Sequence, residues 1–295
     1  MIKDEKIIGV FCALLAVLIW SGFILVSRVG GISALTPYDV IAIRYVTCAV
    51  LLFPIWLIFY RFNLFRFEFI ISALIGGLAY SVFVFKGFEL SSALHGGILL
   101  PGLIPVFVSI ISMVLINAKL GRNKSIGLWM IIIAIIILFY SEIFKSQNMP
   151  IGDIYFVISA FFWALYSVLI NIWHITPWQA TCSLAFITCI TYLPIYLISL
   201  PKNISQASIF DIGLQVFYQG FLACIVQMLL YVKAVKIIGA QGMGSFMALV
   251  PVLAGAFAVM FLDELSSWYL WGAMLLVSLG VLISNLPKEI KLNRT

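Results

Sequence analysis

Long apolar runs alternate with short polar segments along the whole chain, and this alternation predicts an all-helical membrane protein. Ten of the runs are long enough to cross a bilayer as an α-helix, which takes about 20 residues. We expect these helices at 9–29, 37–60, 69–89, 93–117, 125–142, 152–173, 177–200, 211–232, 240–262 and 267–286. Because the helices use nearly all of the chain, we expect no separate soluble domain.

The basic residues lie almost entirely in alternate gaps between these runs, and this predicts an orientation. If the N-terminus is cytoplasmic, the cytoplasmic segments contain Lys3, Lys6, Arg61, Arg66, Lys119, Arg122, Lys124, Lys233, Lys236, Lys288, Lys291 and Arg294. The opposite loops contain only Lys145 and Lys202. The positive-inside rule then predicts a multi-pass protein of a bacterial-type cytoplasmic (inner) membrane, with both termini in the cytoplasm.

Composition agrees with this class. Hydrophobic residues make up 64% of the chain, charged residues 9%, and the mean hydropathy is +1.19. The basic residues are therefore interpreted as anchors at an anionic lipid surface. We expect the protein to contact membrane lipids and not to bind nucleic acid. The five cysteines all lie within the apolar runs and form no CxxC pair, so we expect neither a metal site nor a cofactor.

The two halves of the chain resemble each other. The segment AVLIWSGFILV around Trp20 aligns with SAFFWALYSVL around Trp163, and Pro37 aligns with Pro177. Further on, GFELSSALHGGILLPGLIPV aligns with KAVKIIGAQGMGSFMALVPV, which pairs Pro105 with Pro251. We therefore predict two repeats, 1–145 and 146–295. Since each contains five helices, an odd number, the second must be inverted in the membrane, as is typical of secondary transporters.

The same segments carry a resemblance to a known family. WSGFILVSR, IAIRYVTCAVLL, the 87–106 segment and GAQGMGSFMALVPVLAGAFAVMFLDE are similar to the EamA-type domains of the drug/metabolite transporter superfamily, over essentially the whole chain. The resemblance implies ten helices, a cavity between helices 3, 4, 8 and 9, and alternating access. The glutamate that the family has after helix 9 is present as Glu264, but Ala118 and Lys119 occupy the matching site after helix 4. We therefore do not expect a coupling site duplicated in both repeats.

Side chains at helical spacing on these helices are the candidates for a substrate-binding cavity. Ser159, Trp163, Ser167 and Asn171 recur every four residues, as do Gln219, Ala223, Gln227 and Tyr231, and such faces are expected to point inward. Interhelical hydrogen bonding in an ordinary interior is the alternative explanation. The predicted cavity residues are Tyr80, Phe83, His95, Leu99, Gly102, Trp163, Tyr166, Ser167, Gln219, Gln227, Tyr231 and Ser245.

Ionisable side chains within apolar runs are costly and therefore need an explanation. Arg44 is interpreted either as a clamp for an anion or carboxylate, or as a structural charge paired with Asp39 or a helix end. Lys86 stands three residues before Glu89, a spacing that permits a local ion pair. We interpret Arg44 and Lys86 primarily as structural buried charges.

Prolines within the apolar runs predict where helices bend. Pro101 and Pro105 lie four residues apart beside several glycines, and the matching run keeps Pro251 but has Met247 opposite Pro101. Each proline removes a backbone donor and crowds the carbonyl four residues earlier. We therefore predict hinges at Pro101, Pro105 and Pro251, with the 93–117 helix bent more strongly than the 240–262 helix.

Several activities are disfavoured, and a carrier remains. No phosphate-binding Walker sequence and no HExxH motif is present, and the carboxylates fall near the ends of the runs. We therefore expect no enzymatic activity. The leading hypothesis is a secondary, ATP-independent transporter of a small organic metabolite such as an amino-acid-like solute, working as a monomer by alternating access. An organic cation or quaternary amine carrier and a lipid flippase are the alternatives.

Overall fold

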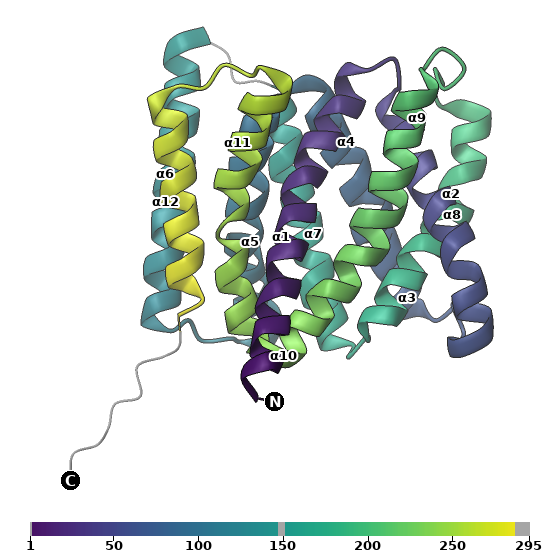
Figure 1. Ribbon diagram of the computed structural model, residues 1–295, viewed down its shortest axis with the longest axis horizontal. Helices are drawn as coiled ribbons and strands as arrows, with labels where there is room; N and C mark the ends of the chain where they lie inside the picture. Colours follow the sequence, from purple (N-terminus) through teal and green to yellow (C-terminus); the bar gives the residue numbers. More distant parts are fainter. Residues whose placement is uncertain (1, 147–150, 287–295) are drawn as a thin grey trace.

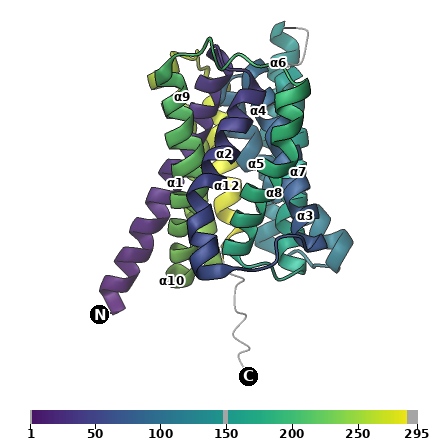
Figure 2. The same ribbon diagram turned by 90° about the vertical axis from the view of Figure 1, so that its right-hand side faces the viewer.

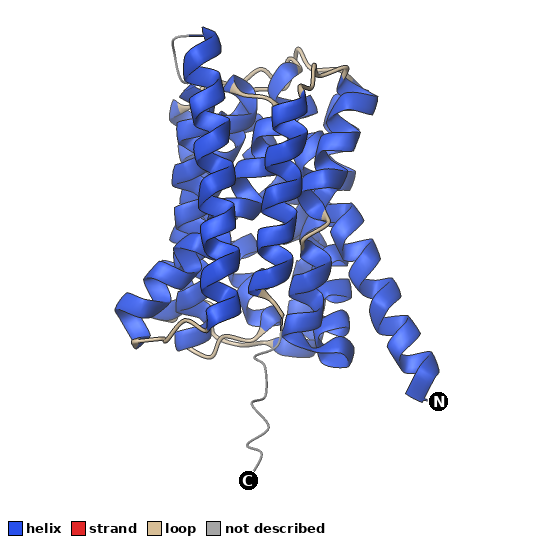
Figure 3. Ribbon diagram, turned by 90° about the vertical axis from the view of Figure 1, so that its left-hand side faces the viewer, coloured by secondary structure: helices blue, strands red, loops and turns tan. Residues whose placement is uncertain are grey.

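The structure is a computed structural model that describes residues 2–146 and 151–286. Helix is the regular secondary structure of these two ranges, and short loops join the helices (Figure 3). Eight helical segments are long and apolar enough to span a membrane, and two shorter apolar helices accompany them. The prediction of an all-helical, multi-pass membrane protein is therefore confirmed.

The first half of the chain supplies six α-helices and two π-helical segments. The α-helices are α1 (Ile2–Ile32), α2 (Pro37–Ile55), α3 (Phe67–Ser72), α4 (Tyr80–Leu90), α5 (Ala93–Ile116) and α6 (Arg122–Ser146). The π-helical segments η1 (Trp56–Tyr60) and η2 (Ala73–Ala79) extend α2 and join α3 to α4. The predicted spans 37–60 and 69–89 are thus each built from α-helical and π-helical turns.

The second half has a similar series of elements. It contains α7 (Ile151–Ile172), α8 (Pro177–Ser199), α9 (Ile209–Gln215), η3 (Val216–Val226), α10 (Gln227–Met247), α11 (Val250–Leu262) and α12 (Trp268–Ser284). The predicted boundary between 211–232 and 240–262 differs from the structure. Gly239 takes a non-helical conformation (φ 79°, ψ 161°), and residues 240–247 continue as the last part of α10. A new helix then begins at Val250, where Pro251 occupies the first turn and needs no hydrogen-bond acceptor.

Matching N-terminal caps explain one landmark shared by the two halves. Thr36 precedes Pro37, and its hydroxyl accepts a hydrogen bond from the Asp39 backbone N–H while the Asp39 carboxylate accepts one from the Thr36 N–H. Thr176 and Gln179 form the same reciprocal pair around Pro177. Both helices therefore begin with a capping box and a proline in the first turn, which satisfies backbone donors that would otherwise be unpaired.

The helices form one bundle with two distinct ends (Figures 1 and 2). We call the end where α1 begins and α12 ends the lower end; the loops around residues 61–66 and 117–121 lie there. The loops at 33–36, 91–92, 200–208 and 263–267 lie at the opposite, upper end. The side of the bundle is apolar, with Ile198 82% and Val114 73% exposed, as expected of a surface that faces lipid.

Two loops that contain basic residues lie at the same end of the bundle. The lower end has the loop that contains Arg61 and Arg66 and the loop that contains Lys119. Lys202 lies in a loop at the upper end. Lys288, Lys291 and Arg294, which the orientation prediction also used, lie outside the described residues.

Candidate functional site

A small enclosed cavity lies between α1, α4 and α5. Its volume is about 10 Å³, and its walls are Trp20, Phe23, Ile24, Tyr80, Leu100 and Pro101. This is room for about one water molecule, far less than a metabolite needs. In this conformation the cavity is therefore too small to hold a metabolite.

An aromatic cluster extends from one wall of this cavity. The ring of Tyr80, which lines the cavity, lies 4.7 Å from the ring of Trp163, and Trp163 lies 5.2 Å from Tyr166. Tyr80 comes from α4, whereas Trp163 and Tyr166 come from α7. The structure thus brings together three of the residues that the sequence placed in a cavity, and it joins them across the two halves of the chain.

Other predicted cavity residues of the first half lie elsewhere. Phe83 stacks on Phe162, on α7, with ring centroids 5.5 Å apart. Leu99 is fully buried in the hydrophobic core. Gly102 faces α6 and α12, where a Cβ would meet Ile131 and Val277 at 3.4 Å. Gly102 therefore contributes close packing between helices and lies away from the aromatic cluster.

The predicted residues of the second half are also separated. Ser167 donates a hydrogen bond to the Trp163 carbonyl, and Ser245 donates one to the Gln241 carbonyl, each within its own helix. Gln227 is half-buried at the start of α10, and Tyr231 is 38% exposed one turn later. Among these side chains, the structure places none in the lining of the enclosed cavity.

A buried histidine–carboxylate pair joins α5 to α7 toward the upper end. His95 Nδ1 lies 2.8 Å from Asp153 Oδ2, and the Ser91 hydroxyl donates a hydrogen bond of 2.5 Å to Asp153 Oδ1. Asp153 is fully buried, and His95 is 7% exposed. A buried carboxylate needs such partners to offset the loss of its hydration. These contacts tie the beginning of α5, in the first half, to the beginning of α7, in the second.

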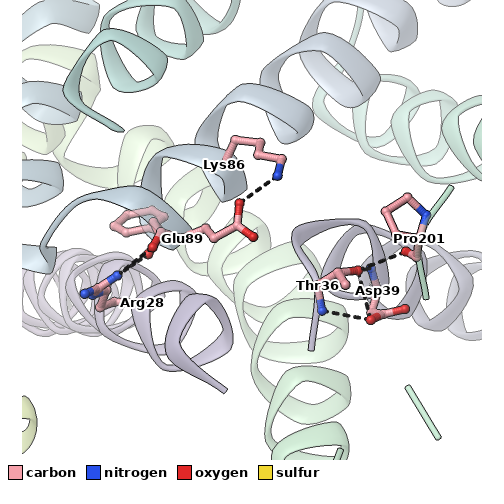
Figure 4. Close-up of polar contacts among 7 residues, drawn as sticks. Arg28, Thr36, Asp39, Lys86, Glu89 and Pro201 are labelled. Atoms are coloured by element: carbon pink, nitrogen blue, oxygen red, sulfur yellow. Dashed lines mark hydrogen bonds and ion pairs between the residues drawn. The ribbon is translucent and has the colours of Figure 1, made fainter. Parts of the chain in front are cut away.

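A second polar link at the upper end centres on Glu264, just beyond α11. Its carboxylate accepts hydrogen bonds from the backbone N–H groups of Ala93 and Leu94, at 2.8 and 2.9 Å, in the first turn of α5. A negative charge is favourable there because the N-terminus of a helix carries a partial positive charge. Arg28 lies 3.6 Å from the same carboxylate. It also donates to the carbonyls of Phe88 and Glu89 (Figure 4). Glu264 therefore connects the second half to α1 and α5.

Further contacts at the upper end are visible in Figure 4. Lys86 donates a 2.7 Å hydrogen bond to Glu89, the local ion pair that their spacing permits. The carboxylate of Asp39 binds Thr36, at the start of α2. It also accepts hydrogen bonds from the Tyr196 hydroxyl and the Asn203 backbone N–H. Asp39 thus holds the α8–α9 loop and pairs with none of the described arginines.

Arg44 lies near the middle of the bundle on α2. It is 9% exposed, and its Nη1 donates a 2.8 Å hydrogen bond to the side-chain oxygen of Gln219, which is fully buried. Gln219 in turn donates to the hydroxyl of Ser27. The interpretation of Arg44 as a partner of Asp39 is therefore wrong, because Asp39 forms its contacts at the end of the helix.

The predicted hinges fall in two different settings. α5 continues through both Pro101 and Pro105, and the Ser109 hydroxyl donates to the Pro105 carbonyl. The matching run of the second half is interrupted at Ala248 and Leu249, just before Pro251. The visible interruption of the helix thus lies in the second half, although the prediction placed the stronger bend in the first.

Sequence reasoning missed the α1 wall of the cavity and the polar links at the upper end. Trp20 occupies the position that aligns with Trp163, so its inward position could have been inferred from the repeat. Asp153 and Glu264 were noted only as carboxylates near span ends. Their partners lie 58 and about 170 positions away along the chain, a distance that sequence spacing does not reveal.

Comparison with known proteins agrees with the class that the fold defines, a multi-pass helical membrane protein. The profile of the EamA-like transporter family matches residues 7–140 and again residues 150–286. The chain therefore belongs to the EamA-like transporter family, and the resemblance found in the sequence is confirmed. One solved crystal structure is similar over 96% of this chain and 98% of that chain, with 19% identity and a TM-score of 0.60, which shows the fold alone. No curated protein sequence matches the chain.

Proposed function

We propose that this protein is a secondary transporter that moves a small organic solute across the cytoplasmic membrane by alternating access, without ATP. An amino-acid-like metabolite is the first candidate for the solute. The two halves are taken as inverted five-helix repeats that enclose one pathway within a single chain, so the monomer is the proposed functional unit. The lower end is assigned to the cytoplasm and the upper end to the opposite side.

The observation that carries this proposal is a set of buried polar contacts that join the two halves toward the upper end of a bundle that also contains a small aromatic-lined cavity. The cavity of about 10 Å³ lies between helices of the first half, and the aromatic cluster that extends from it includes Trp163 of the second half. Toward the upper end, Asp153 and Glu264 of the second half bind the first turn of α5 and its neighbours. Ionisable groups are costly within a membrane protein, and contacts of this kind between two repeats can separate and re-form when a carrier opens and closes that end.

We call the contacts of Asp153 and of Glu264 with the first half the two upper latches. The individual hydrogen bonds of these latches have a strength suited to reversible opening. A hydrogen bond to a charged group contributes about 1.5–3 kcal/mol, and the partners regain hydration when they separate into water. Conformational equilibria of transporters are biased by energies of a few kcal/mol. The latches therefore favour the closed upper end without locking it.

Counterflow in liposomes tests the proposal. Purified protein is reconstituted in liposomes loaded with an unlabelled solute, and uptake of the same labelled solute is measured in the absence of ATP. The panel contains leucine and phenylalanine as amino acids and tetramethylammonium as a quaternary amine. Accelerated uptake of an amino acid in loaded vesicles supports the proposal. A labelled phospholipid that changes leaflet while no solute exchanges would instead indicate a flippase and contradict the proposal.

A further inference from the structure

Arg44 is a buried cation whose described partners are all neutral. Its guanidinium has five N–H donors, and its one described hydrogen bond is the 2.8 Å contact from Nη1 to Gln219 Oε1. Its Nε is buried and has no hydrogen-bond partner. Gln219 is held in place because its Nε2 donates to the Ser27 hydroxyl at 3.0 Å, so the amide oxygen stays turned toward Arg44.

Four described carboxylates toward the upper end of the bundle are bound to groups other than Arg44. Their partners are Tyr196 and Asn203 for Asp39, Lys86 for Glu89, His95 for Asp153 and Arg28 for Glu264. The ion pairs among the described residues do not include Arg44. Arginine within a membrane span is normally paired with an acid or exposed to a water-filled path, because an isolated buried charge is costly.

Aromatic rings compensate this charge only in part. The Arg44 guanidinium carbon lies 5.4 Å from the centroid of the Phe23 ring and 5.8 Å from that of Tyr45. A ring face attracts a cation but offers no acceptor for the unpaired Nε–H. Phe23 also lines the small cavity, so the guanidinium and the cavity share this ring as a neighbour.

We propose that Arg44 is the carboxylate-binding residue of the transport site, and that the solute carries a carboxylate together with an apolar group. This inference rests on the proposed transport function. The carboxylate receives the free N–H donors of Arg44, for which the planar guanidinium is well suited. The apolar group occupies the space beside Phe23 and Tyr80, which widens when the helices open. Phe23, which neighbours both the cavity and the guanidinium, shifts in the same step so that the carboxylate reaches Arg44.

This arrangement selects by charge. A carboxylate neutralises Arg44 in a site of low polarity, where the attraction between opposite charges is stronger than in water. A neutral amide leaves the arginine charge unpaired, and an organic cation is repelled by it. The site is therefore expected to favour anions and zwitterions over quaternary amines of similar size.

The experiment uses matched probes that differ only in charge. The probes are 3-phenylpropanoate and 4-methylpentanoate, with the corresponding amide and amine of each. Binding to the purified protein is measured from the rise in melting temperature with probe concentration, and transport is measured by counterflow. The wild-type protein should bind at least one carboxylate more tightly than its amide and amine. Arg44→Gln should weaken this binding about 10- to 100-fold, the ratio that loss of a charged hydrogen bond implies. Arg66→Gln is the matched control, because Arg66 is exposed and paired with Glu68.

A second variant keeps the test decisive if Arg44→Gln does not fold. Gln219→Glu places a carboxylate beside Arg44 Nη1, at the position where the amide oxygen now lies 2.8 Å away. This internal carboxylate should raise the melting temperature of the ligand-free protein and abolish binding of the carboxylate probes. If Arg44 has only a structural role, the same variant raises the melting temperature but leaves probe binding unchanged.

The possible outcomes separate this inference from the proposed function. Failure of the wild-type protein to bind either carboxylate, or equal binding by Arg44→Gln, overturns the inference. If an amine or amide exchanges across the membrane while the carboxylates do not bind, transport stands and the role of Arg44 is rejected. If the carboxylates bind through Arg44 but no probe exchanges, the anion site stands and the transport function is rejected.

Discussion

His95 Nδ1 and Asp153 Oδ2 lie 2.8 Å apart in the interior, and this contact joins α5 of the first half to α7 of the second. The carboxylate has no exposed surface, and its other oxygen is bound by Ser91. The pair therefore links the two halves toward the upper end of the bundle, and in the proposed mechanism it stabilises the closed state of that end.

Asp153→Asn should loosen the upper end. The amide keeps the size of the side chain but removes its charge, so a charge-assisted bond to His95 is lost. We expect a loss of about 1.5–3 kcal/mol for the closed arrangement, which raises the open population about 10- to 100-fold. Transport should fall or become leaky, as measured by counterflow. Asp211→Asn is the control, since Asp211 binds only Ser208 in its own exposed cap, and it should behave like the parent.

Glu264→Gln should weaken the second upper latch. The single oxygen of the amide can still accept from one of the two backbone N–H groups of Ala93 and Leu94, but the amide NH₂ then faces the other N–H group. The attraction between the carboxylate and Arg28 is also lost. We expect a decrease in the free energy of unfolding of about 1–2 kcal/mol. Thermal unfolding of the purified protein measures it. Asp263→Asn changes the adjacent, exposed carboxylate and should leave the melting temperature unaltered; an equal decrease in both variants would show that the latch is unimportant.

Trp163→Ala tests whether the aromatic cluster borders a space that opens. Trp163 is half-buried beside Tyr80 and Tyr166. We expect transport to fall strongly while unfolding changes by less than about 2 kcal/mol, since a ring beside a cavity is less tightly packed than a core ring. Phe88→Ala is the comparison, because Phe88 is fully buried against Phe156, and it should cost about 3–5 kcal/mol. Similar severe losses in both variants would make Trp163 an ordinary core residue.

Gly87→Ala should disturb the close approach of α4 to α7. A Cβ at Gly87 would lie 2.6 Å from the Phe156 ring, so the helices or the ring must shift. We expect a destabilisation of about 1–3 kcal/mol, the usual effect of overpacking. At Gly213 no atom lies within 4 Å of the added Cβ. Gly213→Ala should therefore be neutral or slightly stabilising, and thermal unfolding of the two variants gives the comparison.

Much of the fold could be predicted because the membrane imposes a regular length on apolar segments. The starts of α2 and α8 were marked by Pro37 and Pro177, whose cap residues are local in sequence. The non-helical backbone at Gly239 and the interruption before Pro251 could not be located, since α10 continues past Gly239 to Met247, within the run predicted as the 240–262 helix. Helical spacing predicted that Trp163 faces the interior. Trp20 was not predicted to do so, although the repeat aligns it with Trp163.

The polar contacts were harder to predict than the helices. Arg44 was interpreted either as an anion clamp or as a structural charge paired with Asp39 or a helix end, whereas its described hydrogen-bond partner Gln219 comes from η3, 175 residues later. His95 was considered alone, and its carboxylate partner comes from the other half. Such pairs depend on how the two halves pack together, and one sequence does not show this.

Accessibility of a cysteine at position 99 tests most directly whether the upper end is a gate. Leu99→Cys is introduced into a variant lacking the five natural cysteines, and a membrane-impermeant thiol reagent is applied to the outside of intact cells. Leu99 is fully buried one turn below His95, so labelling should be slow. Addition of Asp153→Asn should accelerate it about 10-fold or more, because the upper end opens more often. Equal labelling rates with and without Asp153→Asn would contradict the account, because the His95–Asp153 contact would then have no effect on opening of the upper end.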